Sequence, residues 1–373
     1  MTDGHPDIYA RLGIEKIINA ADTYTVLGGG PLAVPVLEAM AAASAGHVRI
    51  VDLFDAIGAR IAEISGNEAA LVTSGAGAAV LLAIAATIAG GAQGAVDATP
   101  DHRTERREVV VLCAQRNQYD RMVRIAGGVL REAGYSDGTT DWQLRDAISE
   151  RTAAILWFAG TQFENYALDF TTVAAIGREA GVPVIVDAAA QIPPASNLGH
   201  YTRNGATAVA FSGGKGLRGP QATGLLLGRR SFVEIARAHA FPRAAIGRAM
   251  KVSKEDACGL LAAVEIAVSL DEAAEYRRYQ AICEDILAAL ADKAHAQAAI
   301  VPNGHLGQFY PRVRIDLSGA EDAAAIAEAF EANRPPIAVG RDALLPRTVF
   351  INPFNLMADE LTPLIEAARR ILR

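Results

Sequence analysis

The chain has 373 residues, of which 51% are hydrophobic and 21% charged, and its formal net charge is −7. This composition indicates a folded α/β chain and excludes a disordered or fibrous one, while the acidic balance argues against a nucleic-acid-binding surface. The three cysteines lie far apart without a Cys-x-x-Cys pair, so we expect reduced thiols and no metal site such as structural zinc.

The N-terminal segment is polar and lacks the apolar centre of a signal peptide. The longest charge-free stretch, 69–96, is mostly alanine and is interrupted by Thr73-Ser74-Gly75 and by later glycines. A strand, a glycine turn and a buried helix explain this stretch better than a membrane span does. We therefore expect a cytoplasmic protein that binds neither membrane nor nucleic acid.

Strands and helices alternate from residue 51 onward. Residues 51–64 have helical spacing and 78–89 form an apolar helical segment, while short continuous apolar runs predict strands at 70–73, 108–113, 153–158, 184–187, 207–212 and 223–227. This pattern is typical of an α/β fold with a mostly parallel sheet and helices on both faces. Such a sheet places its functional site at the carboxyl ends of the strands.

The composition changes after about Arg230. The later segments predict a long helix, a half-buried strand, a helix, a short strand and a final helix, at 254–293, 308–316, 323–332, 348–352 and 361–372. They indicate a smaller C-terminal α+β domain. We divide the chain into an N-terminal segment 1–45, a large domain 46–240 and a small domain 241–373.

Two of the predicted strands lead into residues whose side chains can take part in catalysis. The strand 184–187 ends in Asp187, and the next strand runs through two glycines into Lys215. An acid and a lysine at adjacent strand ends are what a pyridoxal phosphate (PLP) enzyme needs, because the lysine forms a Schiff base with the cofactor and the acid pairs with its ring nitrogen. Taken alone, Lys215 could be an ordinary loop lysine, but its setting and its partner favour the cofactor.

The turn Thr73-Ser74-Gly75-Ala76 joins a strand to a helix and is a candidate phosphate site. Free backbone N–H groups at a helix start attract anions, and the two hydroxyls could add donors. A tight turn with small residues for packing is the alternative. A dinucleotide-binding turn fits less well, because position 80 is not glycine and no acid ends a strand about twenty residues on.

Ser212 and Lys215 have the Ser-x-x-Lys spacing of penicillin-recognising hydrolases. The Ser-Asp-Asn and Lys-Thr-Gly elements of those enzymes are missing, and two glycines interrupt the helix that their serine opens. In a PLP enzyme, Ser212 would instead donate its hydroxyl to the cofactor phosphate.

The segments 186–194 and 211–221 resemble the selenocysteine synthase-like (SelA-like) group of fold type I PLP enzymes, and within it the branch of D-glucosaminate-6-phosphate ammonia lyases. Supporting similarity lies at 17–28, 69–75, 246–255 and 336–341. The resemblance implies a fold type I PLP-dependent transferase-like architecture and a homodimer or higher homo-oligomer.

The resemblance also assigns residues. It implies that Lys215 carries the cofactor, that Asp187 holds the ring nitrogen, and that Ser74, Gly75 and Ser212 bind the phosphate. Arg341 corresponds to an arginine suited to the substrate carboxylate, which a guanidinium can bind with two hydrogen bonds, although a surface arginine after a strand is an equal alternative.

Two glutamines depart from the group's pattern, and both are kept as cofactor-binding candidates. Gln115 stands where lyase-like relatives tend to have histidine, and an amide cannot titrate as an imidazole can. Gln191 lies four residues after the acid, where relatives often have glutamate; in another PLP group, a glutamine near this position contacts the ring hydroxyl. The tRNA-binding extension of selenocysteine synthase is not expected here, since the catalytic region begins near residue 1.

The substrate candidates besides Arg341 are His47, Arg49, Arg116 and Arg218. His47 and Arg49 precede a helix that in this fold often reaches the neighbouring subunit's site; a solvated helix start is the alternative. The resemblance implies α,β-elimination on a hydroxylated amino acid or amino-sugar acid, giving a 2-keto acid and ammonia. Racemisation, aldol cleavage, transamination and a non-catalytic binding module stay open.

Overall fold

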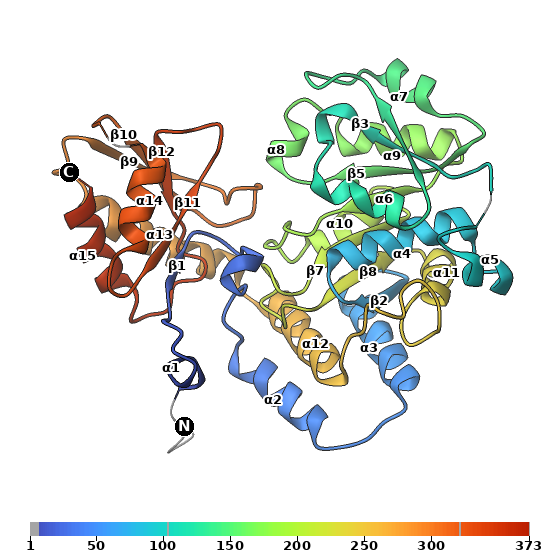
Figure 1. The fold of residues 1–373 in the computed structure, drawn as a ribbon, viewed down its shortest axis with the longest axis horizontal. Coiled ribbons are helices and arrows are strands. Elements are labelled where there is room, and N and C mark those ends of the chain that lie inside the picture. Colours follow the sequence, from blue (N-terminus) through green and yellow to red (C-terminus); the bar gives the residue numbers. More distant parts are fainter. Residues whose placement is uncertain (1–6, 103, 321, 373) are drawn as a thin grey trace. The chain divides into compact units, whose positions relative to one another are not determined.

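The computed structural model describes residues 7–102, 104–320 and 322–372, which form two compact units (Figure 1). The larger unit comprises Gly30–Leu270 together with His305–Gln308. The smaller unit contains the remaining described residues, which come from both ends of the chain.

A seven-stranded sheet with the order β2-β8-β7-β6-β5-β3-β4 forms the centre of the larger unit. Its strands are β2 (Ala69–Thr73), β3 (Glu108–Leu112), β4 (Val129–Ala133), β5 (Thr152–Phe158), β6 (Val184–Asp187), β7 (Ala208–Ser212) and β8 (Gly224–Gly228). Only β8 is reversed, because it pairs antiparallel with both β2 and β7 while the other pairings are parallel. The first residue of β8 therefore lies at the edge where the other strands end.

The helices of the larger unit cover both faces of this sheet (Figure 1). They are α2 (Val34–Ser44), α3 (Ile50–Ser65), α4 (Ala76–Ala89), α5 (Gln93–Ala98), α6 (Arg121–Ile125), α7 (Asp141–Ala147), α8 (Thr161–Glu164), α9 (Phe170–Glu179), α10 (Asn197–Arg203), α11 (Arg230–His239) and α12 (Lys254–Ser269). The central strand β5 is buried throughout: Ile155 and Trp157 pack with α3, α9 and α12, whereas Leu156 and Phe158 pack with α4 and α11. This alternation explains why β5 is apolar without interruption.

The charge-free stretch 69–96 forms β2, a glycine turn and α4, as the sequence predicts. α4 is apolar on all sides because most of its residues are buried between the sheet and other helices. In the part of the chain that the structure describes, no helix combines the length and apolarity needed to cross a bilayer.

The smaller unit contains a five-stranded sheet with the order β1-β11-β12-β10-β9. Its strands are β1 (Ile18–Ala20), β9 (Ala296–Val301), β10 (Arg312–Leu317), β11 (Ile337–Arg341) and β12 (Thr348–Ile351), and its helices are α1 (Ile8–Arg11), α13 (Glu272–Ala289), α14 (Ala323–Glu331) and α15 (Leu361–Ile371). β1 pairs parallel with β11, so the N-terminal segment completes the sheet built by the C-terminal part.

Two differences from the sequence-based organisation concern the ends of a helix and the boundaries of the units. The predicted helix 254–293 is two helices, α12 and α13, because Asp271 caps a new helix by accepting a hydrogen bond from the Ala274 amide at 3.0 Å. The units divide at Gly30 and after Leu270 rather than at 45/46 and 240/241, because α2 and α12 pack on each other within the larger unit.

Candidate active site

Asp187 and Lys215 lie at the carboxyl edge of the large sheet. Asp187 is the last residue of β6 and is only 8% exposed, while half-buried Lys215 follows β7. Burial raises the pKa of Asp187; the Ala189 amide, which donates to Oδ1 at 3.0 Å, and the positive charge of Lys215 act in the opposite direction. The structure thus places the predicted acid within electrostatic reach of the predicted lysine.

Backbone hydrogen bonds hold the loop that carries Lys215. The Gly213 amide donates to Thr223 O at 2.8 Å, the Gly219 amide donates to Gly213 O at 2.8 Å, and the Arg218 amide donates to Lys215 O at 2.9 Å. The loop after β7 therefore folds back onto the start of β8 and presents Lys215 at a defined position.

The turn between β2 and α4 has the geometry of an anion site. Gly75 precedes α4 with φ +122° and ψ +165°, a conformation essentially restricted to glycine, and no side chain caps the helix. The first amides of α4 are therefore available to an anion. Ser74 is half-buried beside them, whereas Thr73 donates its hydroxyl to Gly75 O at 2.9 Å and so stabilises the turn itself.

The reversed strand β8 brings Ser212 to this turn. Gly224, the first residue of β8, is the register partner of both Thr73 and Ser212, so the ends of β2 and β7 flank it. A Cβ on Gly224 would lie 2.7 Å from the Ala76 nitrogen, so glycine is needed where the turn crosses the strand. Sequence reasoning missed Gly224, although a glycine at the start of a predicted strand was a signal of close backbone approach.

Gln115 is fully buried, and both polar atoms of its amide are used by the scaffold. Its Nε2 donates to Phe158 O at 2.9 Å, and its Oε1 accepts from the Phe158 amide at 3.1 Å. The pairing of β3 with β5 ends before Phe158, so the glutamine side chain replaces the missing backbone partner. This position supports the end of β5, and contact of Gln115 with the cofactor stays a prediction.

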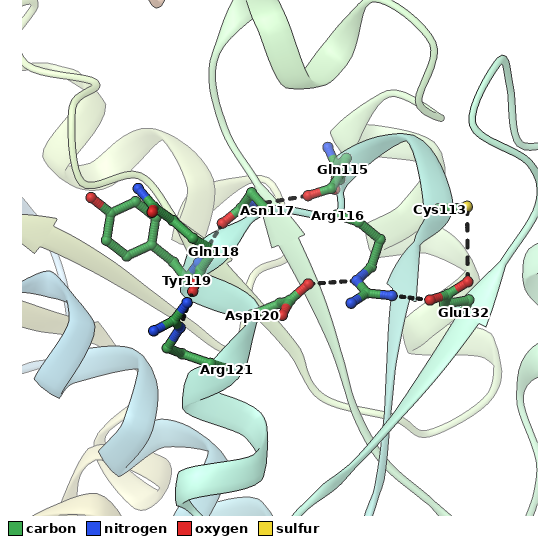
Figure 2. Close-up of polar contacts among 9 residues, drawn as sticks. All are labelled: Cys113, Gln115, Arg116, Asn117, Gln118, Tyr119, Asp120, Arg121 and Glu132. Atoms are coloured by element: carbon green, nitrogen blue, oxygen red, sulfur yellow. Dashed lines mark hydrogen bonds and ion pairs between the residues drawn. The ribbon is translucent and has the colours of Figure 1, made fainter.

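Arg116 lies in an ion-pair network rather than alone (Figure 2). Its guanidinium binds the buried carboxylate of Asp120 and the carboxylate of Glu132 on β4, and the Cys113 thiol is 3.9 Å from the same Glu132. Asn117 braces the turn by donating to Gln115 O at 2.9 Å. The network ties the turn after β3 to β4, and substrate binding by Arg116 stays a prediction.

The other candidates lie in three places. Half-buried Arg218 lies three residues after Lys215 and has a φ of +53°. His47 and Arg49 are exposed just before α3 in the same unit. Arg341 is exposed at the end of β11, in the smaller unit.

Gln191, four residues after Asp187, is hydrogen-bonded to other segments of the larger unit. Its side-chain amide donates to Leu306 O at 3.1 Å and lies 3.5 Å from Ala159 O. Asn197 in turn donates to Gln191 O at 2.7 Å. The structure thus uses this side chain to join segments that are remote in the sequence.

Comparison with known proteins gives a consistent result. The model of the SelA family, described as L-seryl-tRNA selenium transferase, matches residues 51–308. The chain is 32% identical over 324 residues to D-glucosaminate-6-phosphate ammonia lyase of Salmonella typhimurium, covering 85% of this chain and 84% of that protein. It is also 32% identical over 347 residues to 5'-C-glycyluridine monooxygenase-decarboxylase of a Streptomyces species, covering 90% and 84%.

Solved structures show the same relationship. The structure of D-glucosaminate-6-phosphate ammonia-lyase matches with a TM-score of 0.84 and 27% identity, covering 100% of this chain and 98% of that one. Aspartate aminotransferase from Thermus thermophilus matches with a TM-score of 0.53 and 18% identity, covering 97% and 93%. The architecture is therefore that of fold type I PLP enzymes.

Proposed function

Because this chain belongs to the SelA family, we propose that it is a PLP-dependent lyase of the ammonia-lyase type. Its substrate is a hydroxylated amino acid or amino-sugar acid, from which α,β-elimination gives a 2-keto acid and ammonia. The observation that carries this proposal is that Asp187, Lys215, Ser212 and the Gly75 turn lie at one edge of the large sheet.

The residues at this edge fit PLP. The uncapped start of α4 and the Ser212 hydroxyl would hold the phosphate, and Lys215 Nζ would bind the cofactor covalently. The buried Asp187 carboxylate would pair with the protonated ring nitrogen, which would offset the desolvation that raises its pKa. When bound, PLP supplies an electron sink for the charge left at the substrate α-carbon.

Lys215 would have two tasks when its amine is not bound to the cofactor. Its free amine takes the proton from the α-carbon, and the resulting ammonium donates a proton to the departing β-hydroxyl. Asp187 would hold a proton at the ring nitrogen of the bound cofactor. The net reaction needs no oxidant or reductant, since the water lost in the elimination is regained when the product hydrolyses to keto acid and ammonia.

Substrate binding would fall to basic side chains of this chain. We assign Arg341 to the substrate carboxylate and keep His47, Arg49, Arg116 and Arg218 for its other polar groups. We also propose a homo-oligomer in the cytoplasm. Exposed apolar side chains on α2 and beside His47 and Arg49, among them Val34 at 65% and Val48 at 57% exposure, support coverage of this region by a second copy.

The first test is the absorption spectrum of the purified protein before and after borohydride, with Lys215→Ala as comparison. We expect a visible band that borohydride bleaches and that the variant lacks. Wild-type protein should then release ammonia and a 2-keto acid in equal amounts without an added amino acceptor. Absence of the band after PLP is added would refute the cofactor assignment and the lyase with it.

A second reaction has one specific observation in its favour. The chain is as similar to a monooxygenase-decarboxylase as to an ammonia lyase, with 32% identity in both cases. Uptake of O₂ with release of CO₂ from an amino acid would support this reaction and contradict the lyase. Inverted substrate chirality, aldehyde release or a requirement for a keto-acid acceptor would instead indicate racemisation, aldol cleavage or transamination.

A further inference from the structure

Residues His305–Gln308 form a short strap that belongs to the larger unit, although the chain on either side belongs to the smaller one. The strap lies against the start of α8, just after β5. The Thr161 amide donates to Leu306 O at 3.3 Å, and the Thr161 hydroxyl donates to His305 O at 3.4 Å. The strap is thus bound at the edge of the sheet that carries Asp187.

Gln191 connects this strap to the loop that follows Asp187. Its side-chain Nε2 donates to Leu306 O at 3.1 Å and lies 3.5 Å from Ala159 O. Its backbone amide donates to Ala188 O at 3.0 Å, and the Ala159 amide donates to Asp187 O at 2.9 Å. The buried Gln191 side chain therefore joins the strap to the residue that follows β5, and backbone bonds connect both to the end of β6.

The strap is shaped for this contact. Gly307 has φ +90°, and a Cβ there would lie 2.8 Å from Thr161 Cγ2. Gly160 has φ +133°, and a Cβ there would lie 3.4 Å from Leu306 Cβ. The buried Gln308 accepts from the Leu306 amide at 2.9 Å and so keeps Leu306 O turned toward Gln191. Glycine on both surfaces is therefore needed for the close fit.

We propose that Gln191 is a positioning residue, which locks the 305–308 strap and thereby fixes the loop that follows Asp187. Its amide donor is used for this lock and not for the cofactor ring. The consequence for catalysis rests on the proposed function. When the lock is broken, the loop that follows Asp187 must be ordered as the ligand binds, so KM rises while kcat changes less.

The sharpest test is Gln191→Glu. An ionised carboxylate has no donor for the carbonyl oxygens of Leu306 and Ala159, whereas a protonated one keeps a single donor. At about pH 8, we expect hydrogen exchange at the Thr161 and Leu306 amides to be about two- to tenfold faster than in wild type. At about pH 4 the difference should shrink. KM should rise by a similar factor at neutral pH.

Two controls isolate this effect. Asp187, Lys215, Glu164 and His305 are titratable groups on described segments packed around Gln191 and Ile192. Wild type measured over the same pH range accounts for them and for the intrinsic pH dependence of exchange. Gln162→Glu adds the same charge on the exposed side of α8 without removing the lock, so its exchange at Thr161 should match wild type.

A second variant keeps the proposal testable if Gln191→Glu does not fold. Gly307→Ala forces the strap away from Thr161 without changing Gln191, and it should accelerate exchange of the same amides equally at both pH values. Wild-type exchange in Gln191→Glu, or equal acceleration in Gln162→Glu, would overturn the lock. These readouts do not depend on the cofactor, so failure of the proposed function would show separately, as a missing absorption band.

Discussion

Replacing Gln115 by leucine should destabilise the larger unit strongly, although the two side chains are similar in size. Gln115 and Phe158 are 0% and 2% exposed, so water cannot replace the amide. The substitution leaves the Phe158 N–H and C=O unpaired, and an unpaired buried polar group costs about 1–3 kcal/mol. Two such groups give an expected loss of about 2–6 kcal/mol in the free energy of unfolding.

Urea unfolding followed by tryptophan fluorescence measures this loss. Both tryptophans, Trp142 and Trp157, lie in the larger unit, and Trp157 precedes Phe158, so the signal follows the affected sheet. The matched control is Gln118→Leu on the same turn, where the side chain is exposed; its effect should stay within about 0.5 kcal/mol. A loss below about 1 kcal/mol for Gln115→Leu would refute the bracing role of this amide.

Three further predictions follow from the site and its surroundings. Asp187→Asn should lower kcat of the PLP-loaded protein on the order of 100-fold, measured as ammonia release, without lowering the melting temperature of the cofactor-free protein, because burial disfavours the carboxylate. Gly224→Ala should weaken PLP binding about tenfold in an absorbance titration, because the new Cβ meets the Ala76 amide. Burial lowers the pKa of His239, so below about pH 6.5 the unfolded chain binds more protons than the folded chain, and the free energy of unfolding decreases as the pH is lowered. His239→Gln should flatten this dependence in urea midpoints measured across that range.

The main features of the larger unit follow directly from the sequence. Continuous apolar runs predict β5, β6 and β7, since a strand buried on both faces tolerates few polar residues. β4 was missed because it lies at the sheet edge and most of its residues are exposed. Because the strands end where the apolar runs end, the sequence also placed Asp187 and Lys215 at a common edge.

Tertiary structure alone decided the partners of the polar side chains. Gln115 bonds Phe158, 43 residues away, and Gln191 bonds Leu306, 115 residues away. Local pattern cannot reveal such partners, because a buried amide pairs with whichever backbone group the packing leaves unpaired. The reversal of β8, which brings Ser212 to the Gly75 turn, depends in the same way on how remote segments pair. The sequence by itself therefore determined which residues carry the chemistry, and the packing determined which of them are held by the scaffold.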